Sequence, residues 1–589
     1  MEDSLILFVA RAGRKNGIGH FRRMETLISL TEDASVLAVL LPAKEIADFR
    51  TSPLGNRSQV HVAEGDAASW KAALDLVLPV IVVLDIREAP RYLLDELRRR
   101  AIPFVSWDDT GAGREEAEAL LSPLPSARPK SANYETPEWL PLAVSSVRTV
   151  PAKADRLALV SFGGSDPSDS ARLVLTALYE NGAPEGWKIL AVEGPLADYS
   201  RWKGNFPEAE FLHAPDNLTD WIALADLVFT SVGMTLSEAR SLGKPAVLLT
   251  PARYHSRIAA AAAKSDPGVT FLGRAGRVKA ASIRKALGRA PGFGTETPGA
   301  PSSFDFRAEW NRLLGRLIDL GSARCPVCGS SLRTAVHRAT DHTLYRCRRC
   351  GTSHKYFLRE PAKAYDESYF GTNHAAAYGK TYLEDEPAIR EFSRRRLDVI
   401  RALLPPLERP SLLDCGSALG VFASEAVSRG FDAKGLEISE HARGVARERF
   451  GVESFADVPE CGGPFDAVTM WFFLEHMDNP EAWLLRARGI LADGGILALG
   501  LPSAGGPLAR FNTRLYAKIR PEEHYFEPSP EAMRRLVRKC GFEVLKTECF
   551  GLHPDRAGLP RWKGLMRLQK RLELGDTFEL YARKLPAPR

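Results

Sequence analysis

LLDCGSALG, residues 412–420, is the most informative stretch of the chain for its fold. An apolar run that ends in a glycine-bearing turn, followed by a helix-like stretch through Ser428, predicts a strand and a helix of an open parallel α/β sheet. The turn departs from the dinucleotide pattern G-x-G-x-x-G, because Ala418 stands at the middle glycine position and Asp414 precedes the turn. A carboxylate at this place is poorly suited to a pyrophosphate and well suited to a cationic ligand.

A second carboxylate follows the next predicted strand. Glu437 stands 21 residues after Gly416, where an acidic side chain can accept hydrogen bonds from both hydroxyls of a ribose. S-adenosylmethionine combines a ribose with a positive amino group and a positive sulfonium. The two acids therefore predict a site for S-adenosylmethionine.

More motifs surround this turn within residues 365–584. LLDCGSALG is followed in order by GLEIS, FADVPE, FDAVTMWFFLEHMDNP, ILADGGILALGLPS and HYFEPSPEAMRRLVRKCGFEVL. Together these motifs resemble the class I S-adenosylmethionine-dependent methyltransferases. The resemblance implies a Rossmann-like domain in which Asp414, Gly416 and Gly420 line the methionine end of the cofactor. It also implies that Glu437 holds the ribose and that Asp457 lies beside the adenine.

His476 follows the fourth predicted strand of this domain, at the carboxyl edge where open parallel sheets bind ligands. It is a candidate catalytic base, because a neutral imidazole can take a proton from a hydroxyl or a carbon acid as a methyl group moves. The alternative is a local hydrogen-bonding role at a helix start. His524 and Tyr525 lie in a second loop and either face the acceptor or are structural.

Two matched C-x-x-C-G motifs precede this domain. Cys325 and Cys328 are separated by 18 residues from Cys347 and Cys350. Four thiolates at this spacing predict a tetrahedral, structural Zn²⁺ site, with a redox dithiol or chance as the alternatives. This segment and the following YDESYF together resemble the N-terminal part of sugar C-methyltransferases. The remaining cysteines lie in apolar sequence and are expected to be reduced core thiols.

Residues 1 to about 285 alternate short apolar runs with amphipathic, helix-like stretches. One parallel sheet is predicted from the runs at 5–10, 36–41, 80–84 and 104–107. A second is predicted from the runs at 157–162, 189–193, 227–230 and 246–250. Proline-rich sequence separates the two sets, so we expect two α/β lobes with a cleft between them.

Three strand ends in these lobes carry glycines followed by a predicted helix start. The first is GIGH, which ends in Gly19 and His20; the second contains Gly163 and Gly164; the third contains Gly233, with Thr235 and Glu238 in the helix. Helix N-termini favour phosphate, and Glu238 can bind ribose hydroxyls. The pattern predicts a nucleotide-sugar site.

GIGHFRR, SWDDTG, VSFGGSDPSD and GMTLSEARSLGKPAVLL carry a resemblance over about residues 5–285. They resemble the UDP-sugar hydrolases of pseudaminic acid biosynthesis, in the GT-B glycosyltransferase superfamily. The resemblance implies that His20 activates the nucleophile at the anomeric carbon. The implied nucleotide-sugar-binding residues are Gly19, Asp85, Gly163, Gly164, Gly233, Thr235 and Glu238. The chain departs from the family at Arg87, where it tends to have Tyr, and at Tyr254-His255, where it tends to have Asn-Gln.

Length and composition bound the organisation. The chain has 589 residues, of which 45% are hydrophobic and 26% charged, as in globular proteins of several domains. The expected domains are a GT-B-like N-terminal lobe (1–135), a nucleotide-binding lobe (136–290), a linker and helix (291–320), a zinc ribbon (321–360) and a methyltransferase domain (361–589). The net charge of +6 is too small to favour nucleic acid. Since no signal peptide or membrane span is evident, we expect a cytoplasmic protein.

These features predict a bifunctional enzyme of α/β class. A GT-B-like pair of lobes would hydrolyse or transfer a nucleotide-linked sugar, with a UDP-sugar as the favoured partner. A methyltransferase domain would modify a sugar or glycan acceptor in surface-glycan or nonulosonic acid type biosynthesis. One alternative is a glycosyltransferase that decorates a polymer. In another, the N-terminal lobes are a non-catalytic module that delivers glycan or nucleotide to the methyltransferase.

Overall fold

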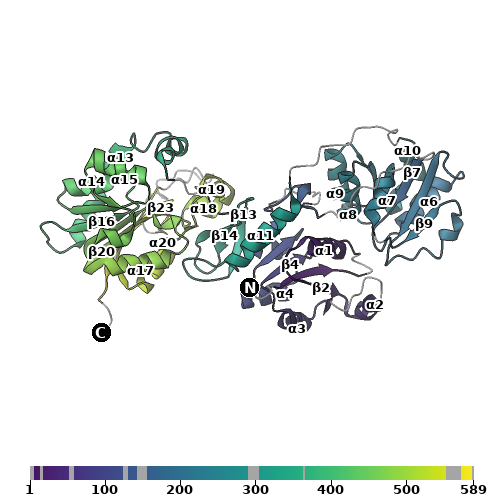
Figure 1. The fold of residues 1–589 in the computed structure, drawn as a ribbon, viewed down its shortest axis with the longest axis horizontal. Helices are drawn as coiled ribbons and strands as arrows, with labels where there is room; N and C mark the ends of the chain where they lie inside the picture. The colour runs from purple at the N-terminus through teal and green to yellow at the C-terminus, as the bar shows by residue number, and fades with distance from the viewer. Residues whose placement is uncertain are drawn as a thin grey trace. The chain divides into compact units, whose positions relative to one another are not determined.

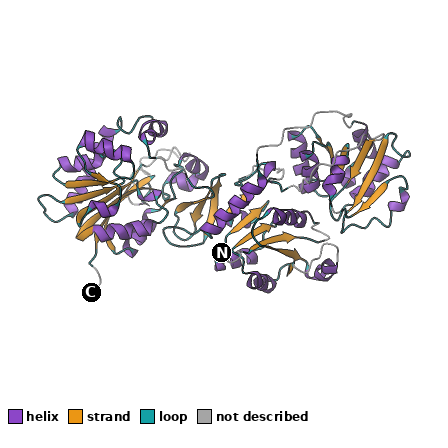
Figure 2. Cartoon of the chain, in the orientation of Figure 1, coloured by secondary structure: helices purple, strands orange, loops and turns teal. Residues whose placement is uncertain are grey.

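A computed structural model describes residues 5–13, 18–51, 59–123, 131–141, 156–215, 217–289, 304–361, 365–551 and 572–586. The chain divides into two compact units, Met1–Ser322 and Ala323–Arg589 (Figure 1). The expected linker at 291–303 and the start of the GIGH turn lie outside the described residues. Each unit is built around parallel β-sheet covered by helices (Figure 2).

The first lobe of the N-terminal unit is a six-stranded parallel sheet in the order β3-β2-β1-β4-β5-β6. Its strands are β1 (Ile6–Arg11), β2 (Ser35–Leu41), β3 (Val60–Ala63), β4 (Ile81–Asp85), β5 (Phe104–Trp107) and β6 (Ala119–Leu121). Its main helices are α1 (Gly19–Leu30), α2 (Ile46–Thr51), α3 (Ala67–Val77) and α4 (Arg91–Arg100). The central strands β1 and β4 are almost wholly buried, which explains their continuous apolar sequence.

The second lobe repeats this topology. Its parallel sheet has the order β12-β11-β10-β7-β8-β9. The strands are β7 (Arg156–Val160), β8 (Trp187–Glu193), β9 (Glu210–His213), β10 (Leu227–Thr230), β11 (Ala246–Thr250) and β12 (Val269–Arg274). The helices are α6 (Ser170–Tyr179), α7 (Leu218–Leu224), α8 (Met234–Ser241), α9 (Arg253–Ser265) and α10 (Ala280–Gly288). Strand order reverses between β7 and β10, and open α/β sheets bind ligands at such points.

Helix α11 (Phe306–Leu320) ends the N-terminal unit and packs on the first lobe. Its Trp310 is fully buried, with its ring centroid 5.7 Å from that of Trp107 and its Nε1–H donating to Thr31 Oγ1 over 3.0 Å. Asp305 caps the helix by accepting a hydrogen bond from the backbone N–H of Ala308. The helix therefore belongs to the core of the first lobe.

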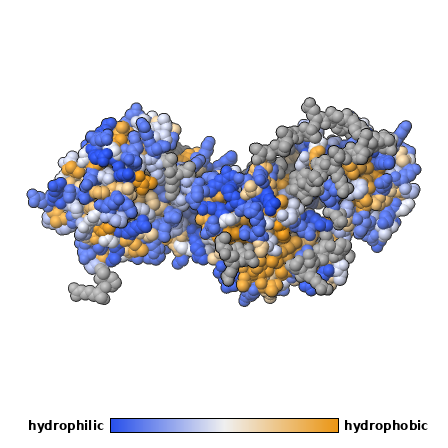
Figure 3. Space-filling view, viewed as in Figure 1, coloured by the Kyte–Doolittle hydropathy of each residue, from blue (hydrophilic) through white to orange (hydrophobic). Residues whose placement is uncertain are grey.

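The C-terminal unit contains a seven-stranded sheet in the order β18-β17-β16-β19-β20-β23-β22. Its strands are β16 (Ser411–Cys415), β17 (Asp432–Leu436), β18 (Ser454–Phe455), β19 (Phe465–Trp471), β20 (Leu491–Pro502), β22 (Phe542–Phe550) and β23 (Thr577–Lys584). Strand β23 runs antiparallel to both of its neighbours, β20 and β22, whereas the other strands of the sheet run in one direction. The principal helices are α13 (Glu386–Leu403), α14 (Val421–Ser428), α15 (Glu440–Phe450), α17 (Pro480–Ile490) and α20 (Pro530–Lys539). The visible face of this unit is mostly hydrophilic (Figure 3).

A smaller antiparallel sheet carries the cysteine motifs. It consists of β13 (Arg333–Arg338), β14 (His342–Cys347), β15 (Ser353–Phe357) and β21 (Phe526–Glu527). The first three strands form the ribbon, whereas β21 comes from a distant part of the same unit. Buried Cys325 and Cys347 also join the apolar core that contains β19 and α20. The ribbon is therefore continuous with the rest of the C-terminal unit.

The α/β class and the predicted parallel sheets are confirmed, and each predicted strand corresponds to an observed one. The prediction omitted the four edge strands of the two N-terminal sheets: β3, β9 and β12 are only partly buried, and β6 is buried but has only three residues. It also omitted the short edge strand β18 and the strands of the small antiparallel sheet. The remaining cysteines, Cys415, Cys461, Cys540 and Cys549, are buried thiols, as expected. None of the helices in the described residues is both long and apolar enough to cross a membrane.

Candidate active site

The turn after β16 needs glycine at two positions. Gly416 and Gly420 have φ angles of +74° and +85°, a region that side chains with a Cβ rarely adopt. A Cβ at Gly416 would also lie 2.6 Å from the ring of Phe473. The backbone N–H of Gly416 donates to the carbonyl oxygen of Leu436 over 2.8 Å, which ties the turn to β17. The turn is thus held open beside the carboxyl ends of β16 and β17.

Asp414 lies at the end of β16 with only 3% of its surface exposed. Its Oδ1 accepts a hydrogen bond from the hydroxyl of Thr469, on the neighbouring strand β19, over 2.6 Å. Burial raises the pKa of Asp414 to about 7, with the bond from Thr469 opposing this shift. The carboxylate is therefore poised to ionise when a positive group arrives.

Glu437 directly follows β17 and is held by two backbone donors. Its Oε1 accepts from the N–H of Ser439 over 2.9 Å, and its Oε2 accepts from the N–H of Ala418 over 3.0 Å. Burial nevertheless raises the pKa of Glu437. The bond to Ala418 joins the carboxylate to the glycine turn, so Glu437 and Asp414 occupy one site.

Asp457 follows the next strand, β18, and is exposed. Its side chain accepts from the N–H of Val458 and caps a short helix, α16 (Val458–Cys461). The three acids thus lie at the carboxyl ends of three neighbouring strands, β16, β17 and β18. Tyr382, which the sequence analysis did not select, interacts electrostatically with both Asp414 and Glu437; only tertiary structure brings it there.

These residues fit S-adenosylmethionine. Within the described part of the chain, neither Asp414 nor Glu437 forms an ion pair, although both are largely buried. Buried carboxylates are normally paired with a cation, and a ligand with a sulfonium and an amino group supplies one. The positive-φ glycines leave the backbone bare where such a ligand would approach.

Two histidines lie together past the carboxyl end of β19. A 3-10 turn (Leu474–His476) directly follows this strand, and the rings of His476 and His524 meet edge to face with centroids 4.8 Å apart. Tyr525 donates its N–H to the backbone oxygen of Glu475 over 2.7 Å and so ties the two segments together. The structure thus brings together His476 from one predicted loop and His524 and Tyr525 from the other.

A buried network holds His524. Its Nδ1 lies 3.1 Å from Oε1 of Glu527, whose other oxygen lies 3.0 Å from Arg520 Nε and also accepts from the hydroxyl of Tyr516. Although burial opposes ionisation, Arg520 and these hydrogen bonds hold the pKa of Glu527 below its usual range. An ionised carboxylate only accepts, so the Nδ1 of His524 donates to Glu527, and the Nε2 takes no part in this contact.

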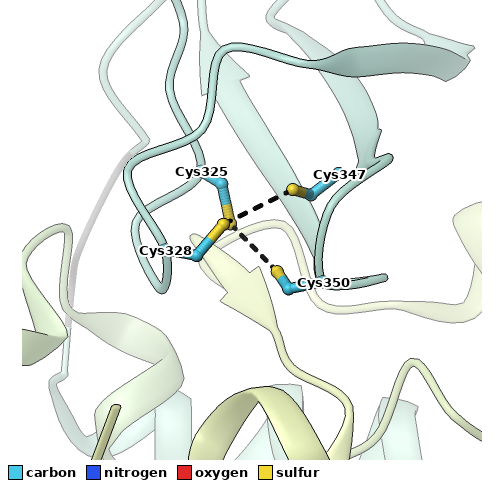
Figure 4. A group of neighbouring side chains, drawn as sticks. All are labelled: Cys325, Cys328, Cys347 and Cys350. Atoms are coloured by element: carbon cyan, nitrogen blue, oxygen red, sulfur yellow. Dashed lines mark hydrogen bonds between the residues drawn. The ribbon is translucent and has the colours of Figure 1, made fainter. Parts of the chain in front are cut away.

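The four motif cysteines form one cluster (Figure 4). The sulfurs of Cys325 and Cys350 lie 3.6 Å apart, as do those of Cys328 and Cys347. These separations are too long for a disulfide and close to the ~3.8 Å expected between thiolates arranged tetrahedrally around zinc. The cluster therefore fits a closed four-thiolate metal site.

The ribbon supports the loop that carries His524. Ser353 and His354 of β15 pair with Glu527 and Phe526 of β21. Lys355 donates its backbone N–H to Tyr525 O over 2.8 Å, and its Nζ donates to the carbonyl oxygen of Pro521 over 2.7 Å. Order in the cysteine ribbon is thereby coupled to the position of the histidine loop.

In the N-terminal unit, His20 lies in a buried network of charges. His20 and Arg23 are three residues apart on one face of α1. The Nδ1 of His20 lies 2.6 Å from Oδ1 of Asp85, and Arg23 binds both oxygens of Asp85 over 2.6 and 2.7 Å. Arg23 also donates to Asp108 over 2.8 Å. Although burial opposes ionisation, Arg23 and His20 lower the pKa of Asp85 to about 2.

Asp85 and His20 differ in their exposure to solvent. Asp85 is fully buried, whereas the side chain of His20 is 30% exposed. Asp85 therefore orients the imidazole through its Nδ1, and the Nε2 of His20 takes no part in this contact. Gly19 is the first residue of α1.

The predicted nucleotide-binding residues of the second lobe lie after β7 and β10, which are adjacent in the sheet. Gly163 has a φ of +82°, and Gly164 follows it in the turn. Gly233 caps α8, which contains Thr235 and Glu238. Burial raises the pKa of Glu238 to about 7.

The two departures from the resembled hydrolases lie against each other. The guanidinium carbon of Arg87 stands 3.4 Å from the centroid of the Tyr254 ring. Burial and the nearby Arg87 lower the pKa of His255. The substituted positions thus form one contact.

Comparison with known proteins identifies a methyltransferase domain within the C-terminal unit. Residues 389–547 match the family model described as a methyltransferase domain. The chain therefore contains an S-adenosylmethionine-dependent methyltransferase domain, and the glycine turn, Asp414 and Glu437 lie within it.

Individual relatives match parts of the chain. An uncharacterized protein of Mycobacterium tuberculosis is 31% identical over 193 residues, which are 32% of this chain and 64% of that protein. A ubiquinone biosynthesis O-methyltransferase of Alkalilimnicola ehrlichii is 29% identical over 119 residues, 18% of this chain and 47% of the relative. The chain thus spans less than two thirds of the length of these curated relatives. Among solved structures, the magnesium protoporphyrin IX methyltransferase of Synechocystis matches 37% of this chain and 97% of its own, with 15% identity and a TM-score of 0.28.

Proposed function

We propose that this chain is a bifunctional sugar-modifying enzyme whose C-terminal unit methylates a sugar or glycan. One observation carries the methyltransferase part. Asp414 and Glu437 are two largely buried acids at the ends of adjacent strands, and the glycine turn lies between them. The proposal of a sugar acceptor is supported by the resemblance of the ribbon and of YDESYF to sugar C-methyltransferases.

Each residue of this site has a proposed task. Bound S-adenosylmethionine supplies an electrophilic methyl group. Asp414 and Gly420 bind the methionine end, Glu437 accepts hydrogen bonds from the ribose, and Asp457 lies beside the adenine. On the acceptor side, His476 takes a proton from the attacking oxygen or carbon. The four cysteines hold a structural zinc, which keeps the ribbon and the attached histidine loop in place.

The test uses the intact chain, an isotopically labelled methyl donor and a panel of UDP-, CMP- and GDP-linked sugars. Mass spectrometry of the products should show the label on the sugar of at least one panel member. Methylation only of non-sugar acceptors would reject the sugar part of the proposal and retain the methyltransferase. Absence of donor binding would reject both.

The N-terminal unit is proposed to break or transfer the glycosyl bond of a nucleotide-linked sugar. The specific observation in favour is the His20–Asp85 contact of 2.6 Å, with Arg23 neutralising the buried acid. This arrangement is that of a catalytic base with an orienting carboxylate. Gly163, Gly164, Gly233, Thr235 and Glu238 are proposed to hold the nucleotide.

Release of UDP distinguishes the possible N-terminal roles. A hydrolase releases UDP with water alone, and a transferase requires a glycan acceptor. If the intact chain binds nucleotide or glycan but releases no UDP under either condition, the lobes are a non-catalytic module.

A further inference from the structure

We propose that Glu475, His476 and His524 form a binding site for one divalent transition-metal ion, separate from the four-cysteine cluster. Each of the three side chains offers one ligand atom, and these atoms all lie within 4.8 Å of one another. Two imidazoles and one carboxylate are a recurrent ligand set for zinc, iron and manganese.

The distances are close to those of a bound ion. Ligand atoms at about 2.1 Å from a metal lie about 3 Å apart when adjacent and about 4 Å apart when opposite. The three ligand atoms lie within 4.8 Å of one another, so a shift of about 1 Å in each would bring them to these separations. Glu527 holds the Nδ1 of the His524 ring, and this contact leaves the Nε2 untied.

Glu475 provides the second, independent observation. Glu475 is fully buried, and no other residue in the described part of the chain donates a hydrogen bond to either of its carboxylate oxygens; the nearby donor is its own backbone N–H. A buried carboxylate without a partner is costly. A cation bound between the carboxylate and the two histidines removes that cost.

The surroundings of His524 are those of a metal ligand. Metal-bound histidines usually donate the N–H of the other ring nitrogen to a carboxylate, which fixes the tautomer and the ring plane. Glu527 does this for His524 at 3.1 Å and is fixed in turn by Arg520 at 3.0 Å. The Nε2 lone pair is thereby left for the ion.

Three protein ligands leave coordination positions open, unlike the closed four-thiolate cluster. The site lies past the end of β19, and Phe473 on the same turn packs against Gly416 of the glycine turn. Resting on the proposed function, an open position here would take an oxygen of the methyl acceptor, so acceptors with a hydroxyl or carbonyl oxygen are favoured. His476 would act as the base of the proposed function only in the metal-free site, because the bound ion uses the lone pair of its imidazole. Metal binding itself does not depend on that function.

Manganese separates the two metal sites, since Mn²⁺ prefers oxygen and nitrogen ligands to thiolates. The intact chain, with its cysteines loaded with zinc, is titrated with Mn²⁺ and free Mn²⁺ is measured by electron paramagnetic resonance. The wild-type chain should bind one Mn²⁺. Glu475→Gln and His524→Gln should each weaken binding at least about tenfold. His441→Asn, an exposed histidine elsewhere in the unit, is the matched control and should bind like the wild type.

Thermal melting and binding of S-adenosylhomocysteine show whether each variant is folded. Absence of Mn²⁺ binding to the wild-type chain would overturn the proposal, as would unchanged binding in both folded variants. Either result leaves the proposed methyltransferase intact, because donor binding is measured in the same samples. If the wild-type chain binds Mn²⁺ but not the methyl donor or its demethylated product, the metal site stands and the proposed methyltransferase function is rejected.

Discussion

Asp414 makes the affinity for S-adenosylmethionine depend on pH in a defined direction. Burial places the pKa of this acid at about 7 in the free protein. Only the ionised carboxylate attracts the positive ligand, so the affinity should follow the ionised fraction. That fraction falls from about nine tenths at pH 8 to about one tenth at pH 6, and we expect the dissociation constant to rise about tenfold.

Isothermal titration calorimetry between pH 6 and pH 8 measures this effect. The amino group of the ligand gains a proton as the pH falls, which would strengthen binding, so the expected weakening has the opposite sign to the titration of the ligand. Asp414→Asn should bind weakly at every pH and show no slope. Asp432→Asn, an exposed acid at the start of β17, is the matched control and should behave like the wild type.

The same acid affects the stability of the free protein. Its folded pKa lies above the ordinary value of 3.8, so its stabilising contribution is complete below about pH 4 and is lost as the pH rises through 7. A shift of about three units corresponds to at most about 4 kcal/mol. Asp414→Asn should therefore raise the melting temperature at pH 8 and change it little at pH 4. A pH-independent dissociation constant in the wild type, or full affinity in Asp414→Asn, would refute this reasoning.

Three further predictions follow from the other parts of the structure. Glu437→Ala should weaken S-adenosylmethionine binding by about 1–3 kcal/mol, through loss of charge-assisted hydrogen bonds to the ribose; calorimetry at pH 8 measures it, and unchanged affinity contradicts the assignment. Elemental analysis should find zinc in the cysteine cluster, and Cys347→Ser should release it and reduce methyl transfer more than donor binding, because the ribbon supports the loop of His524; a zinc-free wild type purified under reducing conditions rejects this. His20→Ala should reduce UDP release by about 10²–10⁴-fold with nearly unchanged UDP affinity, whereas Glu238→Ala should first weaken nucleotide binding; a raised KM with unchanged kcat in His20→Ala would remove His20 as the base.

The sequence predicts the sheets because their central strands are buried on both faces. Continuous apolar runs, such as those of β1 and β4, predict buried strands directly from the sequence. Edge strands do not: β9 has the sequence EFLH and is partly exposed throughout, so it lacks such a run. The glycine turn, Asp414 and Glu437 were predictable because they follow strands that are adjacent in both sequence and space.

Other parts of the site depend on long-range packing. Asp85 lies 65 residues from His20 in sequence, and only the pairing of β1 with β4 brings their side chains together. Glu475 stands next to a candidate base in the sequence, but its backbone contact with the segment that contains Tyr525 is a long-range feature of the fold. The role of the ribbon in holding His524 depends on the pairing of β15 with β21, which are separated by more than 150 residues.

The most direct test of the central claim is calorimetric titration of S-adenosylmethionine, and of its demethylated product, into the intact chain at pH 8. The account predicts one site per chain for each ligand, with affinity lost in Asp414→Asn and Glu437→Ala and kept in Asp432→Asn. Failure of both ligands to bind, or a preference for NAD, would contradict it.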